Sequence, residues 1–257
     1  MLSALENIYI SPLELCNLNC KYCYTKKTKN ILSNRQILSF VRRYRKQIKL
    51  KSIIFCGGEV FTLKNFPRLI NKLNSLGIFV SIITNGTIDK LDKIKDPRNC
   101  QLIVSFDGPQ NIHDANRGSG NFAKSKNFVE HALKLGFPVE IFYLITKDSY
   151  PYKDSLDIFG LHKTYLTDRL GSLTPKQVLE IRQNYPVFPP KNFGCSQLAL
   201  QSNGKFYGCC ESLKPIASLH DSIKKIVANF IKVSTVNPLC CDPDYFCDLK
   251  DIKKIAK

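Results

Sequence analysis

Short apolar runs alternate along the chain with longer segments in which apolar residues recur every three or four positions. The short runs predict β-strands at residues 8–13, 52–55, 79–84, 101–106, 139–145 and 163–166. Several of these runs are continuous and rich in β-branched side chains, as at residues 53–55 and 80–83. Such runs are typical of parallel strands that are covered on both faces.

The longer segments predict helices between the strands. Ser33 and Gln36 form a potential capping box ahead of apolar positions at helical spacing. Two further helices, 65–76 and 121–135, are each followed by a glycine, which suits a helix C-terminus. Repeated βα units require a parallel sheet with right-handed crossovers. We therefore expect an α/β fold, a partial (β/α)6 barrel whose chemistry lies at the C-terminal ends of the strands.

The alternation weakens after residue 150, and a group of prolines near residue 190 marks a boundary. Residues 196–201 and 205–207, joined by a turn at Asn203-Gly204, predict a short β-hairpin, and a helix is expected over 218–233. The sequence thus predicts two domains: a barrel, residues 1–190, and a small cysteine-rich lobe of hairpin and helix, residues 191–257.

Composition narrows the class of protein. Hydrophobic residues make up 44% of the chain and charged residues 23%, as in globular proteins. No apolar run approaches the roughly 20 residues needed to cross a bilayer, so we expect no membrane partner. The first ten residues lack the features of a secretory signal. We therefore expect a cytoplasmic protein.

The net charge of +17 has two interpretations. It would attract nucleic acid or an acidic substrate, or it reflects a lysine-rich composition whose charges are merely solvated. The densest basic stretch, residues 42–51, falls largely on the polar side of a predicted helix, and no RRM or KH signature is present. Nucleic acid is therefore a possible partner that the sequence does not favour.

The eleven cysteines fall mainly into two groups, three within residues 16–23 and six within 195–247. A reducing compartment argues against a disulfide framework, so the grouping points to metal or iron–sulfur ligation. In the first group, Cys16, Cys20 and Cys23 have the spacing C-x3-C-x2-C directly after the first strand. Three thiolates can hold three irons of a cubane cluster and leave the fourth iron open. Zinc is the alternative, but zinc sites usually have paired C-x2-C spacings.

This motif, with Tyr22 before the last cysteine, resembles the radical SAM superfamily signature C-x3-C-x-aromatic-C. The resemblance implies a [4Fe–4S] cluster whose open iron binds S-adenosylmethionine (SAM). An electron from the cluster, supplied by an external flavodoxin- or ferredoxin-type donor, then gives a 5′-deoxyadenosyl radical that abstracts a hydrogen atom from the substrate. It also implies that Tyr22 borders the adenine.

A second motif follows the second strand: Phe55-Cys56, then Gly57, Gly58 and Glu59. Glycines let the backbone approach a ligand closely, and a carboxylate can accept hydrogen bonds from an ammonium group. The motif is similar to the GGE sequence that binds the SAM amino group in the same superfamily. Val60 stands where related sequences often have proline.

Polar residues also follow the third and fourth strands. We expect Asn85 to face the ligand, and the resemblance implies that Ser105 meets the SAM ribose. Asp107 is expected to contact substrate or act as a base, with an Asx-turn at Asp107-Gly108 as the alternative. Residues 113–117 continue the similarity to the peptide-modifying and sulfatase-maturing branch. Arg117 either pairs with a carboxylate or lies solvated in a loop.

The second cysteine group, with Cys195-x8-Gly204-x4-Cys209, resembles the opening of a SPASM/twitch extension, which binds an auxiliary iron–sulfur cluster. Six cysteines are too few for two four-thiolate clusters, so one cluster is expected. Its preferred ligands are Cys195, Cys209, Cys241 and Cys247, with Cys210 and Cys240 as substitutes. A structural zinc ion is the alternative.

The function expected from these features is a radical SAM enzyme of the SPASM/twitch group that acts on a peptide or protein side chain or on a small metabolite. Two alternatives remain open: an RNA-modifying radical SAM enzyme, motivated by the charge, and a non-catalytic iron–sulfur or zinc protein.

Overall fold

The structure, a computed structural model, describes residues 5–23, 25–161, 164–167, 172–185, 197–210, 212 and 214–236. Within these ranges, one nine-stranded sheet has the order β6-β5-β4-β3-β2-β1-β7-β8-β9. The first six strands are parallel to their neighbours: β1 (Asn7–Ile10), β2 (Ser52–Phe55), β3 (Phe79–Thr84), β4 (Cys100–Phe106), β5 (Val139–Leu144) and β6 (Thr164–Thr167). The predicted partial barrel of parallel strands is confirmed.

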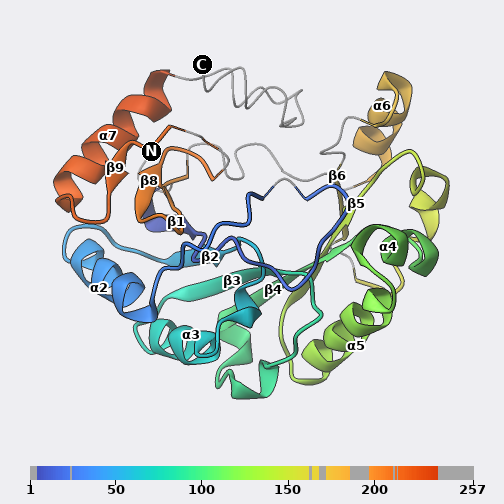
Figure 1. Cartoon of the computed structure of the whole chain (residues 1–257), viewed down its shortest axis with the longest axis horizontal. Helices are drawn as coiled ribbons and strands as arrows, with labels where there is room; N and C mark the ends of the chain where they lie inside the picture. Colours follow the sequence, from blue (N-terminus) through green and yellow to red (C-terminus); the bar gives the residue numbers. More distant parts are fainter. Residues whose placement is uncertain are drawn as a thin grey trace.

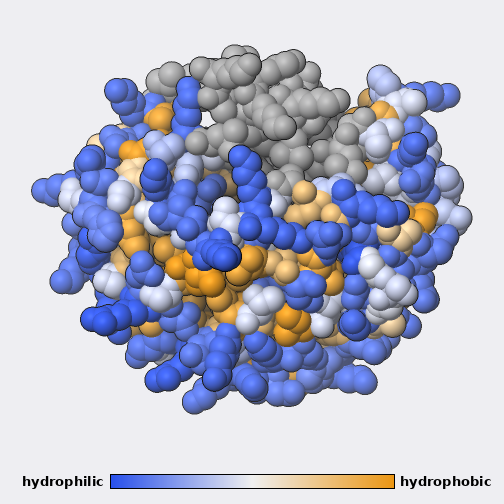
Figure 2. All heavy atoms as spheres, viewed as in Figure 1, coloured by the Kyte–Doolittle hydropathy of each residue, from blue (hydrophilic) through white to orange (hydrophobic). Residues whose placement is uncertain are grey.

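The sheet curves, and helices follow its outer side (Figure 1). The helices are α2 (Asn34–Arg45), α3 (Phe66–Asn74), α4 (Gln110–Arg117), α5 (Asn121–Lys134), α6 (Pro175–Asn184) and α7 (Ile223–Val236). Single turns of 3-10 helix occur at Val60–Thr62, Leu91–Lys93 and Pro97–Asn99, and a longer one at Tyr150–Ser155. Figure 2 shows the molecule from the same side as Figure 1; apolar residues gather near the centre of this face, with hydrophilic residues around them.

The side chains of each strand alternate between two apolar layers. Ile8 and Ile10 of β1 belong to the large core beneath the helices, whereas Tyr9 between them packs in a smaller cluster on the other face. That smaller cluster also contains Ile54 and Tyr207. Because successive side chains of a strand point to opposite faces, the smaller cluster marks the inner side of the curved sheet. Each fully buried large side chain contributes about 1.5–3 kcal/mol to stability.

Local sequence determines where several elements begin and end. Ser33 and Gln36 form the predicted capping box, with the Gln36 N–H donating to Ser33 Oγ at 3.2 Å and the Ser33 N–H donating to Gln36 Oε1 at 2.9 Å. The same motif at Thr174 and Gln177 starts α6, a helix that the apolar pattern did not predict. β1 ends at Ile10 rather than at residue 13, because Pro12 lacks an N–H for the ladder.

The C-terminal hairpin consists of β7 (Ala199–Leu200) and β8 (Lys205–Tyr207), which pair antiparallel as predicted. β9 (Ala217–Ser218) pairs with β8, so α7 begins later than the predicted residue 218. β7 pairs parallel with β1, with Tyr9 opposite Ala199, so the hairpin extends the barrel sheet. Phe206 of β8 also contacts Phe40 of α2 at 5.0 Å between ring centroids. The predicted boundary at residue 190 lies outside the described residues.

Among the helices that the structure describes, none combines the length and the apolar character needed to span a bilayer.

Candidate active site

Residues 11–23, here called the cysteine loop, leave the C-terminal end of β1 and carry the three predicted cluster ligands. Cys16 and Cys20 are half-buried, and Cys23 is exposed. Burial raises the pKa of the Cys16 and Cys20 thiols, and iron coordination would deprotonate such thiols outright. The loop therefore presents three sulfur atoms at the edge of the sheet where catalytic groups of a barrel are expected.

The turn after β2 packs against the backbone of the cysteine loop. The Gly58 N–H donates to the Leu13 carbonyl, and the Glu59 N–H donates to the Leu15 carbonyl, both at 3.0 Å. A Cβ atom on Gly58 would lie 2.0 Å from the Leu15 oxygen, and one on Gly57 would lie 2.2 Å from the Leu13 oxygen. The sequence indicated a close approach of these glycines to a ligand. In the structure their nearest neighbour is the chain that leads to the cysteines.

Glu59 joins the ends of β2 and β3. Its side chain is 1% exposed; Oε1 accepts hydrogen bonds from Thr84 Oγ1 at 2.8 Å and from the Phe61 N–H at 3.1 Å, and Oε2 accepts one from the Asn85 N–H at 2.8 Å. Burial raises the pKa of this carboxyl, and the backbone hydrogen bonds oppose the rise. A carboxylate has about four acceptor positions, and these three hydrogen bonds occupy three of them.

The side chain of Asn85, directly after β3, lies against the start of the cysteine loop. Its Nδ2 atom donates to Asn17 Oδ1 at 3.1 Å and lies 3.7 Å from Cys16 Sγ. Asn17 in turn donates to Thr87 Oγ1 at 2.8 Å, and the Leu18 N–H donates to Cys16 Sγ at 3.3 Å. The sulfur of Cys16 therefore receives two N–H groups. The sequence pattern did not indicate Asn17, although it lies inside the cysteine motif.

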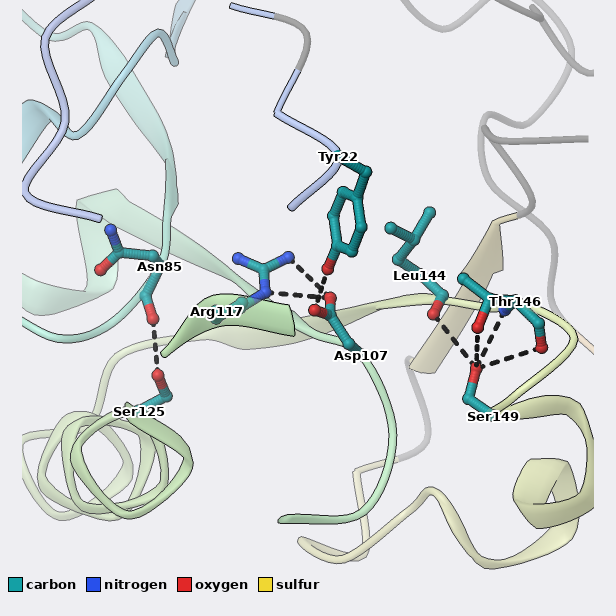
Figure 3. A network of polar contacts seen from close by, with 8 residues as sticks. All are labelled: Tyr22, Asn85, Asp107, Arg117, Ser125, Leu144, Thr146 and Ser149. Carbon is teal, nitrogen blue, oxygen red and sulfur yellow. Dashed lines mark hydrogen bonds and ion pairs between the residues drawn. The ribbon is translucent and has the colours of Figure 1, made fainter. Parts of the chain in front are cut away.

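Asp107, after β4, forms a buried ion pair with Arg117 at the end of α4 (Figure 3). Arg117 Nε and Nη2 both donate to Asp107 Oδ1, at 2.9 and 2.8 Å, and the Tyr22 hydroxyl donates to Oδ2. The Asp107 side chain is fully buried, and that of Arg117 is 11% exposed. Burial raises the pKa of Asp107, and the adjacent guanidinium opposes the rise. Of the two alternatives for Arg117, pairing with a carboxylate is therefore confirmed, and a solvated loop position is wrong.

Ser105 lies within β4, half-buried. Its neighbours Val104 and Phe106 point into the helix-side core, so the alternation of the strand directs Ser105 to the inner side of the sheet. That is the side on which its predicted ribose contact would have to be made.

The donor set fits an iron–sulfur cubane. Within the described ranges, no three His, Cys, Asp or Glu side chains meet around a single point. A cubane does not require that arrangement, because each thiolate binds a different iron. Three thiols spread along eight residues of one loop, two of them partly shielded from water, can each bind a different iron of the cubane.

Of the second cysteine group, Cys209 and Cys210 follow β8 and are half-buried. Cys210 packs against the inner apolar cluster, as does Cys56 from the turn after β2. The other predicted ligands lie outside the described residues: Cys195, Cys240, Cys241 and Cys247.

Comparison with known proteins yields both sequence relatives and structural neighbours. Radical SAM cyclopropyl synthase TigE from Paramaledivibacter caminithermalis is 27% identical over 184 residues, which cover 62% of this chain and 39% of TigE. A probable GTP 3′,8-cyclase from Sulfolobus acidocaldarius is 28% identical over 151 residues, or 56% of this chain and 48% of the cyclase. The chain thus spans less than half the length of either relative.

Two solved structures share the fold. The complex of anSMEcpe with AdoMet and the Cp18Cys peptide superposes with a TM-score of 0.72 at 21% identity, covering 89% of this chain and 82% of that one. Streptococcus suis SuiB bound to S-adenosylmethionine gives 0.71 at 14% identity, covering 89% and 67%.

The sequence model of the Radical SAM superfamily matches residues 10–149, which contain the cysteine loop, the turn after β2 and the Asp107–Arg117 pair. This family implies SAM and a [4Fe–4S] cluster, and its members are enzymes. The chain belongs to the radical SAM superfamily.

Proposed function

We propose that Cys16, Cys20 and Cys23 bind a [4Fe–4S] cluster and that SAM is cleaved reductively at the iron without a protein ligand. The observation that carries this proposal is the placement of three thiols on one loop at the C-terminal end of β1, in contact with the turn at 57–59. Cluster and SAM together would supply a 5′-deoxyadenosyl radical for hydrogen abstraction.

The residues around the loop suggest how SAM is held. Glu59 and the backbone of Gly57 and Gly58 would bind its amino group, since one acceptor position of the buried carboxylate remains unused. Ser105 would meet the ribose from the inner side of β4, and the ring of Tyr22 would border the adenine. Asn85 would contact the ligand from the end of β3.

We further propose that the chain is of the SPASM/twitch type and binds one auxiliary iron–sulfur cluster. Its ligands would be Cys195, Cys209, Cys241 and Cys247, with Cys210 and Cys240 as substitutes, and residues 191–257 would form the cluster-binding lobe. The position of Cys209 two residues after β8 supports this, because the hairpin of β7 and β8 pairs with β1 of the barrel sheet. A structural zinc ion would use the same thiolates.

The proposed substrate is a peptide or protein side chain. Two structural neighbours were solved with peptides, anSMEcpe with Cp18Cys and SuiB with its precursor peptide SuiA. A small metabolite is the second candidate, because several relatives are named GTP 3′,8-cyclases. RNA is the third, on the ground of the charge of +17. The electron would come from a flavodoxin- or ferredoxin-type protein in a reducing, cytoplasmic compartment.

Anaerobic reconstitution with iron and sulfide, followed by dithionite and SAM, tests the first proposal. We expect 5′-deoxyadenosine from the wild type and none from Cys20→Ala. Cys100→Ala is the matched control, because Cys100 is a buried thiol at the start of β4 and should not be needed. A fully reconstituted wild type that forms no 5′-deoxyadenosine would contradict the proposal.

Iron counting tests the auxiliary cluster. With two [4Fe–4S] clusters the protein would bind about eight irons, and Cys195→Ala/Cys209→Ala would retain about four. Zinc in the purified protein, with only about four irons after reconstitution, would instead support the structural zinc ion.

The salt dependence of substrate stimulation distinguishes an RNA substrate from a peptide. Peptide, small-molecule and RNA fractions of cells would each be tested for stimulation of 5′-deoxyadenosine formation. Stimulation by the peptide fraction that persists between about 50 and 200 mM salt is expected. Stimulation by RNA that falls steeply over that range would favour the RNA alternative.

A further inference from the structure

The part of the cysteine loop that carries the three cysteines, residues 16–23, is attached to the barrel near both of its ends. At the start of the motif, Asn17 donates to Thr87 after β3. At its end, the Lys21 N–H donates to the Asn116 carbonyl of α4 at 3.0 Å, and the Tyr22 hydroxyl donates to Asp107. Lys21 and Tyr22 lie between Cys20 and Cys23 in the chain, so the second attachment fixes the segment that joins two of the three cysteines.

Every oxygen of Asp107 has a partner in this arrangement. Oδ1 accepts both hydrogen bonds from Arg117, and Oδ2 accepts the one from Tyr22. Figure 3 shows the three side chains converging from the cysteine loop, the end of β4 and α4. The carboxylate is fully buried, so water does not compete with the tyrosine. Arginine stays protonated at any physiological pH, so the acceptor is held in place permanently.

A general base has different requirements. It must present an unoccupied lone pair to the substrate and have room to take up a proton. Asp107 is fully buried, and its hydrogen bonds come from side chains of the protein itself: two from Arg117, one from Tyr22 and one from Asn116.

We propose that Arg117 and Asp107 are positioning residues for the iron–sulfur cluster. Arg117 fixes Asp107, Asp107 holds the hydroxyl of Tyr22, and the cysteine loop is thereby set in its metal-binding form before metal arrives. This inference rests on the proposed function of Cys16, Cys20 and Cys23 as cluster ligands. It replaces the catalytic role that the sequence suggested for Asp107.

Hydrogen exchange in the metal-free protein gives the first test. Tyr22→Phe removes one hydroxyl and keeps the ring. The amides of residues 20–23 should then exchange about tenfold faster or more, as expected from losing a hydrogen bond to a charged group. Tyr150→Phe is the matched control, because the Tyr150 hydroxyl also donates to a carboxylate, that of Glu180, in another part of the fold. It should leave the amides of the cysteine loop unchanged.

The reconstituted protein gives the second test. In the wild type, SAM should change the electron paramagnetic resonance (EPR) spectrum of the reduced cluster. Tyr22→Phe and Asp107→Asn should weaken that change in the same way and raise the KM for SAM more than they lower kcat. The double variant should resemble either single one, because both remove one linked interaction. Arg117→Lys, which keeps the charge but loses the planar fork, should lie between the wild type and Arg117→Met.

The outcomes are separable. If the wild type binds no iron, the proposed function fails, yet the exchange measurement on metal-free protein still tests the positioning role. Wild-type exchange of residues 20–23 in Tyr22→Phe, or a wild-type response to SAM in Asp107→Asn, would overturn the inference.

Discussion

The side-chain nitrogen Nδ2 of Asn85 lies 3.7 Å from the sulfur of Cys16, and the backbone N–H of Asn85 donates to the buried carboxylate of Glu59. Glu59, after β2, therefore holds the backbone of Asn85, and the side chain of Asn85 donates toward Cys16, a proposed cluster ligand. Hydrogen bonds to cysteine sulfur are among the features that set the reduction potential of an iron–sulfur cluster.

Loss of this donor should make the cluster harder to reduce. Asn85→Ala is expected to lower the reduction potential by roughly 20–60 mV, which corresponds to one hydrogen bond of about 0.5–1.5 kcal/mol for a one-electron couple. A potential titration followed by EPR measures this shift. Asn71→Ala, on the outer helix α3, serves as the control and should not change the potential. An unchanged potential in Asn85→Ala would show that the contact has no electronic effect.

Gly58 is predicted to be indispensable for the cysteine loop. In Gly58→Ala the new Cβ atom would lie 2.0 Å from the Leu15 oxygen, so the backbone of the loop or of the turn must move. We expect the free energy of unfolding to fall by about 1–3 kcal/mol, the typical cost of overpacking, and iron retention to be poor. Urea denaturation and iron analysis provide the measurements. Gly77→Asn is the comparison, because no atom lies near a Cβ at that position and asparagine tolerates its positive φ. Wild-type stability of Gly58→Ala would argue against the packing described.

The fold was predictable to the extent that local patterns determine it. The strands at residues 52–55 and 79–84 and the capping box at Ser33 follow from short-range sequence signals. Helix α4 was not predicted, because His113 is its one buried residue and no apolar repeat results. The pairing of β7 with β1 joins segments far apart in the chain, and neither two-residue stretch indicates its partner.

In the site, too, the sequence predicted individual residues but not the contacts between them. The motifs identified Tyr22, Glu59, Asn85 and Asp107 as separate residues of interest, and the topology of parallel strands placed them at one edge. Which side chain contacts which depends on rotamers and on the path of the cysteine loop. The contact between Tyr22 and Asp107 therefore became visible only in three dimensions.

His113 should destabilise the protein in acid. Its ring is fully buried and packs against Phe106 and Phe122 at 5.1 and 5.6 Å between centroids, and burial lowers its pKa to about 4. The unfolded chain, with a pKa near 6.5, binds the proton first as the pH falls. Stability is thus full above about pH 6.5 and is lost as the pH falls toward 4, by up to about 3 kcal/mol. His113→Phe keeps a ring without the titration, so its unfolding free energy should fall less between pH 6.5 and 4. An identical pH dependence in the variant would refute this assignment.

His131 should act with the opposite sign. Its Nδ1 lies 2.6 Å from Asp89 Oδ2, and this hydrogen bond raises the pKa of the imidazole. A raised pKa in the folded state means that the stabilisation is complete below about pH 6.5 and disappears as the pH rises through the folded value. Because the pair is partly exposed, His131→Gln should lose only about 0.5–1 kcal/mol at pH 6 and nothing at pH 9. Thermal denaturation at the two pH values checks this, and a larger loss at pH 9 would contradict it.

On the proposed function, one iron of the cluster bound by Cys16, Cys20 and Cys23 has no protein ligand and is bound by SAM. Electron–nuclear double resonance of the reduced, reconstituted protein with SAM labelled with ¹⁵N at its amino group measures this directly. We expect a hyperfine coupling between this cluster and the label, and no such coupling in Cys20→Ala, which should lose this cluster and keep the proposed auxiliary one. An intact, reduced cluster that shows no coupling to bound, labelled SAM would contradict SAM binding at this iron.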